Sequence, residues 1–112
     1  MKKTVSLKSY TDFKRVYNES NIKANKYLVI YKKENNLTIN RLGISVSKKV
    51  GNSVVRHHMT RLIRESYRLH EQVFNSGLDI VVVVKPSANK CTYKEIESAL
   101  LHLLKLHNIY MK

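Results

Sequence analysis

The chain has 112 residues, of which 43% are hydrophobic, and its 21 Lys and Arg residues against 8 Asp and Glu give a formal net charge of +13. A chain of this length forms one domain over residues 1–112, and its ordinary apolar fraction excludes disorder as the cause of the charge. The excess charge therefore lies on a folded surface and indicates a polyanionic partner.

Cysteine content and hydropathy exclude further classes of protein. The single Cys91 cannot cross-link the fold, and one cysteine is too few for a zinc ribbon or finger. The longest apolar run, from Ile80 to Val84, is far too short to span a bilayer, and no apolar signal stretch follows the N-terminal lysines. We therefore expect a cytoplasmic protein with no membrane partner.

The first predicted elements are a short helix and a strand. Ser9 precedes a helical repeat that contains Phe13 and Tyr17 and ends near residue 20. Residues 27–31, Tyr-Leu-Val-Ile-Tyr, are β-branched and aromatic, which is typical of a strand. The tyrosines and Phe13 could stack on unpaired bases or could simply belong to the core.

A second strand is predicted over residues 42–46, where apolar residues alternate with small ones. Gly43, Ser45 and Ser47 fall on the same face, so that face is flat, small and polar. Such a face allows another group to approach closely.

The clearest pattern in the sequence predicts a helix over residues 54–74, with Asn52 or Ser53 as its N-cap. A nearly apolar stripe recurs at intervals of four and three, formed by Val55, Met59, Leu62, Ser66, Leu69 and Val73. The opposite side carries a basic ridge, formed by His57, Arg61, Arg64 and Arg68.

The last predicted elements complete the fold. Residues 78–84 form a nearly continuous apolar run, typical of a strand covered on both faces, and Asp79 is interpreted only as the start of that strand. Thr92 and Glu95 form a capping box that begins a final helix. This order predicts a two-layer α/β (α+β) sandwich with one central mixed sheet. Strands 42–46 and 80–84 are parallel in it if they share the sheet, and the basic helix crosses over between them.

The stretch from Arg41 to Arg68 carries the strongest functional signal. Its seven cations, set against the single acid Glu65, are Arg41, Lys48, Lys49, Arg56, Arg61, Arg64 and Arg68. Like charges at neighbouring helical positions repel one another unless a partner supplies the counter-charge. Lys48 and Lys49 also precede a helix N-terminus, which suits phosphate oxygens. This favours a polyanion-binding helix over the alternative that the arginine stems only shield the helix from water.

Patterns for catalysis are missing from the sequence. It contains no Asp-x-Asp pair, no His-Glu cluster, no phosphate-binding glycine loop and no obvious partner for Cys91. The five histidines lack metal-ligand spacing and are interpreted as exposed polar residues. The pattern alone thus indicates a basic RNA-binding α/β domain without an active site of its own.

The segment from Arg41 to Arg68, RLGISVSKKVGNSVVRHHMTRLIRESYR, closely resembles the protein subunit of bacterial ribonuclease P, and a weaker similarity covers the whole chain. In that family the RNA subunit hydrolyses the substrate with bound divalent metal ions, while the small basic protein binds that RNA and the 5′ leader of precursor tRNA. The resemblance implies the catalytic RNA and precursor tRNA as partners, with one protein per RNA. It also implies Mg²⁺ at the RNA active site, no cofactor or metal held by the protein alone, and a left-handed crossover.

The resemblance further implies two groups of site residues. The residues that face the catalytic RNA are Lys48, Lys49, Asn52, Arg56, His57, His58, Arg61, Arg64 and Arg68. The residues of a leader-binding cleft between helix and sheet are Phe13, Tyr17, Tyr31, Ser45 and Ser47. Where the family motif usually reads Arg-Asn-Arg, this chain has Arg56, His57 and His58, and Thr60 stands at a commonly basic position. These changes make the RNA contact weaker or pH-dependent.

Two other functions stay open on the sequence. A structural RNA-binding protein of another ribonucleoprotein, such as the ribosome, would have no effect on precursor tRNA cleavage. An autonomous metal-dependent nuclease would cleave RNA as the protein alone, and the scarcity of acids argues against it.

Overall fold

A computed structural model describes residues 4–110, which form three α-helices, two 3₁₀ turns and five strands. In chain order these elements are β1 (Thr4–Ser6), α1 (Tyr10–Glu19), β2 (Asn21–Ala24), β3 (Leu28–Glu34), β4 (Asn40–Val46), α2 (Ser53–His70), η1 (Glu71–Val73), β5 (Leu78–Val84), η2 (Pro86–Ala88) and α3 (Tyr93–Leu106). None of the helices in this part of the chain is long and apolar enough to cross a membrane.

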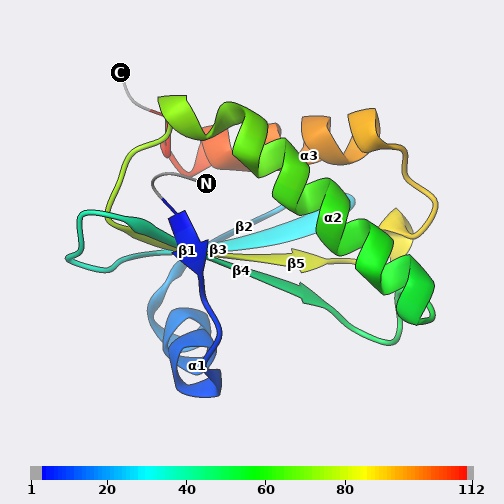
Figure 1. Cartoon of the computed structure of the whole chain (residues 1–112), viewed down its shortest axis with the longest axis horizontal. Coiled ribbons are helices and arrows are strands. Elements are labelled where there is room, and N and C mark those ends of the chain that lie inside the picture. The colour runs from blue at the N-terminus through cyan, green and yellow to red at the C-terminus, as the bar shows by residue number, and fades with distance from the viewer. Residues whose placement is uncertain (1–3, 111–112) are drawn as a thin grey trace.

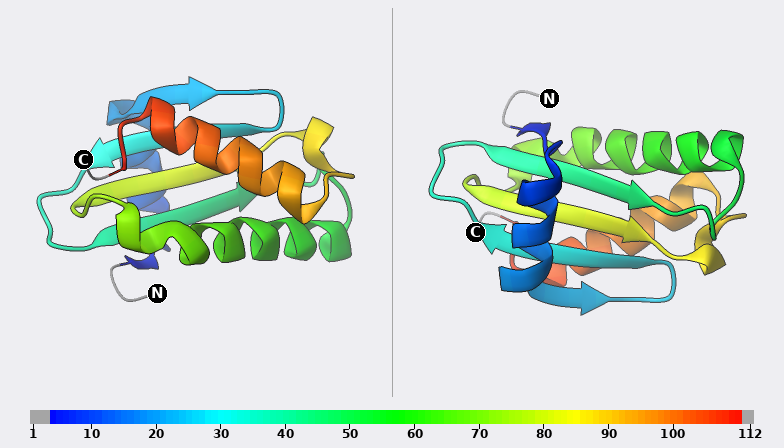
Figure 2. Two further views of the ribbon diagram at one scale, coloured as in Figure 1. Left: turned by 90° about the horizontal axis from the view of Figure 1, so that it is seen from above. Right: turned by 90° about the horizontal axis from the view of Figure 1, so that it is seen from below.

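The five strands form one mixed sheet in the order β1-β4-β5-β3-β2. β4 and β5 are parallel neighbours, as predicted, and β3 runs antiparallel to both β5 and β2. Seen from the helical side with β4 and β5 pointing right, β5 lies above β4 while α2 returns in front of the sheet (Figure 2, left). The crossover is therefore left-handed, and the predicted α+β class with one mixed sheet is confirmed.

Helices cover the two faces of the sheet unequally (Figure 1). α2 and α3 lie side by side on one face and enclose the main core, whose largest fully buried members include Tyr67, Leu28, Ile30, Met59, Ile63, Ile80, Ile96, Leu100, Leu103 and Leu104. α1 crosses the other face, where a smaller cluster contains Leu7, Val16 and Val81. Part of that second face is left without a helix.

The buried side of α2 differs from the predicted stripe. Leu69 and Val73 are 54% and 46% exposed, whereas Ile63 and Tyr67, outside the predicted stripe, are fully buried. The helix packs against both β4 and α3, so its buried arc is wider than a single stripe and is turned toward Ile63 and Tyr67. The α-helix also ends at His70, and the remaining turn to Val73 is 3₁₀.

β1 and β2 were not predicted, because three- and four-residue strands carry too little alternation to be recognised. β1 is tied to the core through a side chain that sequence periodicity does not reveal. The Tyr67 hydroxyl lies 2.9 Å from the Thr4 hydroxyl and accepts a hydrogen bond from the Asn40 amide at 3.2 Å.

Candidate nucleic-acid interface

The loop between β4 and α2 is held by local contacts that leave its lysines in solvent. Asn52 is the N-cap of α2, since its Oδ1 accepts a hydrogen bond from the Val55 backbone N–H at 3.0 Å. Val50 is buried and anchors the loop to the core. Lys48 and Lys49 are exposed just before the positive end of the helix dipole, an arrangement that suits an anion.

The outer side of α2 carries a group of exposed basic side chains. His57, His58, Arg61 and Arg64 are all exposed, and Arg61 and Arg64 make no hydrogen bond or ion pair with any described residue. We call these four residues, together with Lys48 and Lys49, the α2 basic face. Its charges lack internal compensation, so a polyanion can pair with them without displacing a protein partner.

Two of the predicted RNA-facing arginines have a different environment. Arg68 donates two hydrogen bonds to the Glu65 carboxylate, and this contact lowers the pKa of Glu65. Arg56 is half-buried at a hollow of about 430 Å³ that Ile44 and Val46 also line. Its Nε is buried without a hydrogen-bond partner among the described residues. A buried donor of this kind favours an acceptor from outside the chain, such as a phosphate oxygen.

Arg41, which the sequence places in the same basic stretch, serves the fold instead. Its Nε and Nη2 donate to the two Asp79 carboxylate oxygens at 2.8 and 2.7 Å, and Nη1 donates to Asp12 on α1 at 3.4 Å. The Asp79 hydrogen bonds raise the pKa of Arg41. The interpretation of Asp79 as a mere strand start is therefore wrong, because this buried carboxylate also accepts from Asn35 and holds Arg41 against the sheet.

The predicted aromatic residues meet where α1 crosses the sheet. The rings of Tyr17 and Tyr31 are 4.8 Å apart, edge to face, and those of Phe13 and Tyr17 are 6.2 Å apart. A Cβ at Gly43 would lie 2.6 Å from Phe13 Cζ, so any larger residue there would force the Phe13 ring to shift. At this position the group that approaches the small face of β4 is therefore Phe13 of α1, which belongs to the chain itself.

Beyond α1 the same face of the sheet is open (Figure 2, right). Ser45 of β4 pairs in register with Val83 of β5, which pairs with Val29 of β3, and all three are partly exposed. Ser47 follows, exposed, after the end of β4. We call these four residues and the neighbouring aromatic rings the α1–sheet face, which consists of Phe13, Tyr17, Tyr31, Ser45, Ser47, Val29 and Val83. The two valines were missed because strand register cannot be read from one sequence.

The histidines divide into exposed and structural groups. His107 is only 3% exposed, and its Nε2 lies 2.8 Å from the Ile30 carbonyl oxygen, so the expectation that all five are surface residues is wrong. Burial lowers the pKa of His107. His70 pairs with Glu97 at 3.1 Å. Within residues 4–110 no three His, Cys, Asp or Glu side chains gather as a metal site.

Comparison with known sequences gives one consistent result. The family described as Ribonuclease P matches residues 1–108. The ribonuclease P protein component of Lachnoclostridium phytofermentans is 61% identical over 104 residues, which cover 93% of this chain and 90% of that protein. The component from Alkaliphilus metalliredigens is 51% identical over 105 residues, or 94% of this chain and 95% of the relative.

Solved structures agree with the sequences. The Staphylococcus aureus ribonuclease P protein superposes with a TM-score of 0.89 at 36% identity, covering 95% of this chain and 97% of that one. The Thermotoga maritima protein superposes with a TM-score of 0.84 at 29% identity, covering 91% and 96%. A further Staphylococcus aureus structure is of a mutant described as having defective mRNA degradation activity.

Proposed function

The chain belongs to the ribonuclease P protein family, and we propose from this membership that it binds the catalytic RNA of the holoenzyme and positions the 5′ leader of precursor tRNA. Membership makes it the protein subunit of an endoribonuclease whose other subunit is RNA. In our proposal one protein acts with one RNA in the cytoplasm, and the products are the leader and a tRNA with a mature 5′ end.

The α2 basic face is the observation that carries the proposal. Arg61 and Arg64 are exposed on one side of α2, and Lys48 and Lys49 extend from the preceding loop. Phosphates of a folded RNA supply the negative charge that this surface lacks, and release of their counterions favours binding. The unpartnered Nε of Arg56 offers a further donor at the β4 side of the same helix.

The α1–sheet face suits the unpaired leader. Its open row is flat, because Ser45, Val29 and Val83 are small or medium-sized, and the rings of Tyr17 and Tyr31 border it. Unpaired bases stack on aromatic rings with little dependence on sequence. This face lies on the opposite side of the sheet from α2, so leader and catalytic RNA would contact different surfaces of one small domain.

The proposal assigns the chemistry to the RNA, where bound Mg²⁺ would supply water activation and stabilisation of the leaving oxygen. Four of the carboxylates make contacts within the fold. Asp12 and Asp79 bind Arg41, Glu65 binds Arg68, and Glu95 accepts from the Thr92 backbone N–H at 2.9 Å. The role proposed for the protein is to raise substrate affinity and to lower the Mg²⁺ concentration that the RNA needs.

Reconstitution with the cognate RNA subunit at low Mg²⁺ tests this function, with matched precursor tRNAs that carry or lack a leader. We expect the protein to accelerate cleavage and to increase affinity for the leader-bearing substrate more than for the other. Unchanged cleavage would contradict the proposal and would favour a protein of another ribonucleoprotein.

A protein-only reaction on the same substrates is the matched control. Because a Staphylococcus aureus relative has a mutant described by defective mRNA degradation activity, the control also includes a messenger RNA fragment. Cleavage of precursor tRNA at its mature 5′ end by the protein alone would overturn the assignment of the chemistry to the RNA.

A further inference from the structure

The end of the sheet beside the α2 basic face brings together three basic segments. Val46, Val84 and Leu28 are paired across β4, β5 and β3, so the loops 47–52 and 85–92 and the turn 25–27 all lie at this end of the sheet. These segments and the first turn of α3 contribute Lys26, Lys48, Lys49, Lys85, Lys90 and Lys94.

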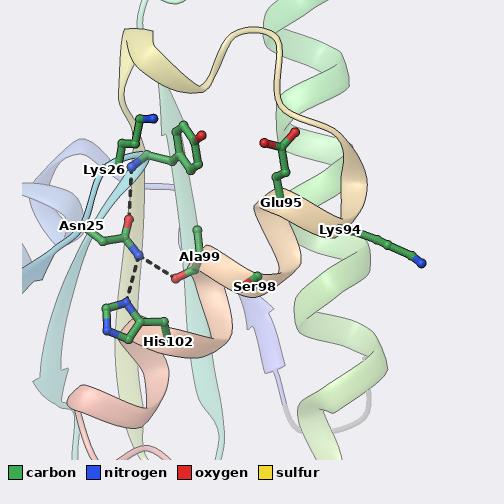
Figure 3. A pocket seen from close by; sticks show the side chains of 8 residues that line it. Asn25, Lys26, Lys94, Glu95, Ser98, Ala99 and His102 are labelled. Carbon is green, nitrogen blue, oxygen red and sulfur yellow. Dashed lines mark hydrogen bonds between the residues drawn. The ribbon is translucent and has the colours of Figure 1, made fainter.

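A pocket of about 450 Å³ opens between the 25–27 turn and α3 (Figure 3). Tyr27 and Ala99 contribute apolar lining, and the polar residues around them are Asn25, Lys26, Lys94, Glu95, Ser98 and His102. The Lys26 ammonium lies 5.3 Å from the centre of the Tyr27 ring. An aromatic ring and a cation therefore stand together at one small hollow, which suits a flat group that carries a negative charge.

The pocket is preformed, because Asn25 ties both of its walls together. Its Oδ1 accepts from the Tyr27 and Leu28 backbone N–H groups, and its Nδ2 donates to the Ala99 carbonyl oxygen at 2.9 Å (Figure 3). From the other side, Lys85 Nζ donates to the Asn25 carbonyl oxygen at 2.7 Å, and the Ser87 hydroxyl donates to that of Lys26. A ligand entering such a pocket needs little ordering of the protein.

Two lysines, Lys26 and Lys94, and one glutamate, Glu95, line the pocket, so its lining residues carry a formal charge of +1. Glu95 is the one acid among its lining residues, and its carboxylate already accepts from the Thr92 backbone N–H as part of the capping box. Lys26 extends beside the pocket, whereas the Lys94 side chain extends from α3 away from the other labelled side chains (Figure 3). An anion is favoured here, because a neutral apolar ligand would leave the lysine charges without a counter-charge.

The pocket and a hollow on the α2 basic face are lined by neighbouring residues at the first turn of α3. A second hollow, of about 460 Å³, is lined by His58, Arg61 and Arg64 of that face together with Leu62, Tyr93 and Glu65, whose carboxylate is paired with Arg68. Tyr93 is followed directly by Lys94, which lines the pocket at Tyr27. One polyanion strand can therefore pass from α2 over the start of α3 to the 25–27 turn.

We propose that this pocket binds one unpaired nucleotide of the ribonuclease P RNA subunit, with its base against Tyr27 and Ala99 and its phosphate at Lys26. The RNA subunit is the source, rather than the leader, because α3 covers the same face of the sheet as α2, while the α1–sheet face is on the other side. This assignment rests on the proposed function, since it extends the same RNA contact.

The affinity of the chain for its RNA subunit tests the pocket directly. Ser98→Tyr fills the hollow from an exposed helical position, and Lys26→Ala removes the cation. We expect Ser98→Tyr to weaken RNA binding about tenfold, within the range of ~1–3 kcal/mol that one stacked base contributes. The matched control is Lys105→Ala, an exposed lysine of α3 outside the pocket, and it should leave affinity nearly unchanged.

A photo-crosslinking amino acid at position 98 in the reconstituted holoenzyme gives an independent measurement that does not depend on the effect of a filled pocket. We expect one crosslinked nucleotide in the RNA subunit and none from the same amino acid at position 105. Crosslinks to precursor tRNA only, or none, would overturn the proposal. Adenosine monophosphate is the probe for a free nucleotide. If the wild type binds this probe while the folded Ser98→Tyr variant binds the RNA subunit with unchanged affinity, the proposal is also overturned.

The two proposals fail in different ways. If the protein does not promote cleavage at low Mg²⁺, the proposed function fails. If it promotes cleavage while thermally stable Ser98→Tyr and Lys26→Ala proteins bind the RNA subunit like Lys105→Ala, only the pocket proposal fails.

Discussion

Arg41 and Arg64 come from the same basic stretch of sequence but have opposite roles in the structure. Arg41 is held by three hydrogen bonds to Asp79 and Asp12, whereas Arg64 is exposed on α2 with no partner among residues 4–110. The first cation fastens α1 to the sheet, and the second is left for a partner outside the chain. The count of seven cations between Arg41 and Arg68 therefore overstates the binding surface, because Arg41 stabilises the fold.

The largest expected effect comes from breaking the internal pair. Arg41→Ala leaves the buried Asp79 carboxylate with Asn35 as its remaining hydrogen-bond donor among the side chains described. Removing one partner of a buried ion pair should lower the free energy of unfolding by about 3 kcal/mol. Urea denaturation measures this loss, and Arg64→Ala is the control, with an expected change within about 0.5 kcal/mol. Equal stability of the two variants would contradict the contrast between these arginines.

The rings on the α1–sheet face should give the next largest effect. Tyr17 is 36% exposed and meets Tyr31 edge to face, so Tyr17→Ala removes a stacking surface for the leader. We expect about thirtyfold weaker binding of leader-bearing precursor tRNA to the holoenzyme, or ~2 kcal/mol, with no change for leaderless substrate. Tyr10→Ala, an exposed tyrosine of the same helix, is the matched control. Equal losses for both substrates would remove the leader from this face.

Periodicity and capping were sufficient to predict that α2 forms, that Asn52 or Ser53 is its N-cap, and the capping box of α3, but not that α2 ends at His70. The signals for these features are local: Asn52 is bonded to Val55 three residues later, and Thr92 to Glu95 in the same way. The family resemblance then supplied the left-handed crossover, which no local pattern contains.

Contacts between distant segments could not be predicted from one sequence. The buried pair of Arg41 and Asp79 joins residues 38 positions apart, and the hydrogen bond of His107 to Ile30 spans 77. An arginine or a histidine in the sequence carries no sign of whether an acid or a carbonyl oxygen will face it. The pocket at Tyr27 was missed for the same reason, because its two walls come from the 25–27 turn and from α3.

A smaller effect should separate two arginines on α2 itself. Arg64→Ala should weaken binding to the RNA subunit about tenfold and lower the log–log salt slope by about 0.7 to 0.9, the contribution of one phosphate contact. Arg68→Ala should have less effect, since Glu65 already neutralises that guanidinium. Binding titrations at several salt concentrations measure both slopes. An unaltered slope for Arg64→Ala would favour the alternative in which these stems only shield the helix.

The smallest expected effect distinguishes a buried histidine from an exposed one. Burial lowers the pKa of His107 from the ordinary value of 6.5, so the unfolded chain binds a proton more readily than the native protein. The stability that depends on neutral His107 is present above pH 6.5 and is lost as the pH falls from there through the lowered native pKa. One such group changes the free energy of unfolding by at most ~1.4 kcal/mol per pH unit.

Urea denaturation between pH 7.5 and 5, compared for the wild type, His107→Gln and His57→Gln, measures this change. We expect the acid-side loss to shrink in His107→Gln and to persist in His57→Gln, whose imidazole lies on the exposed face of α2. The opposite result would show that the acid sensitivity of the fold arises outside the His107–Ile30 contact.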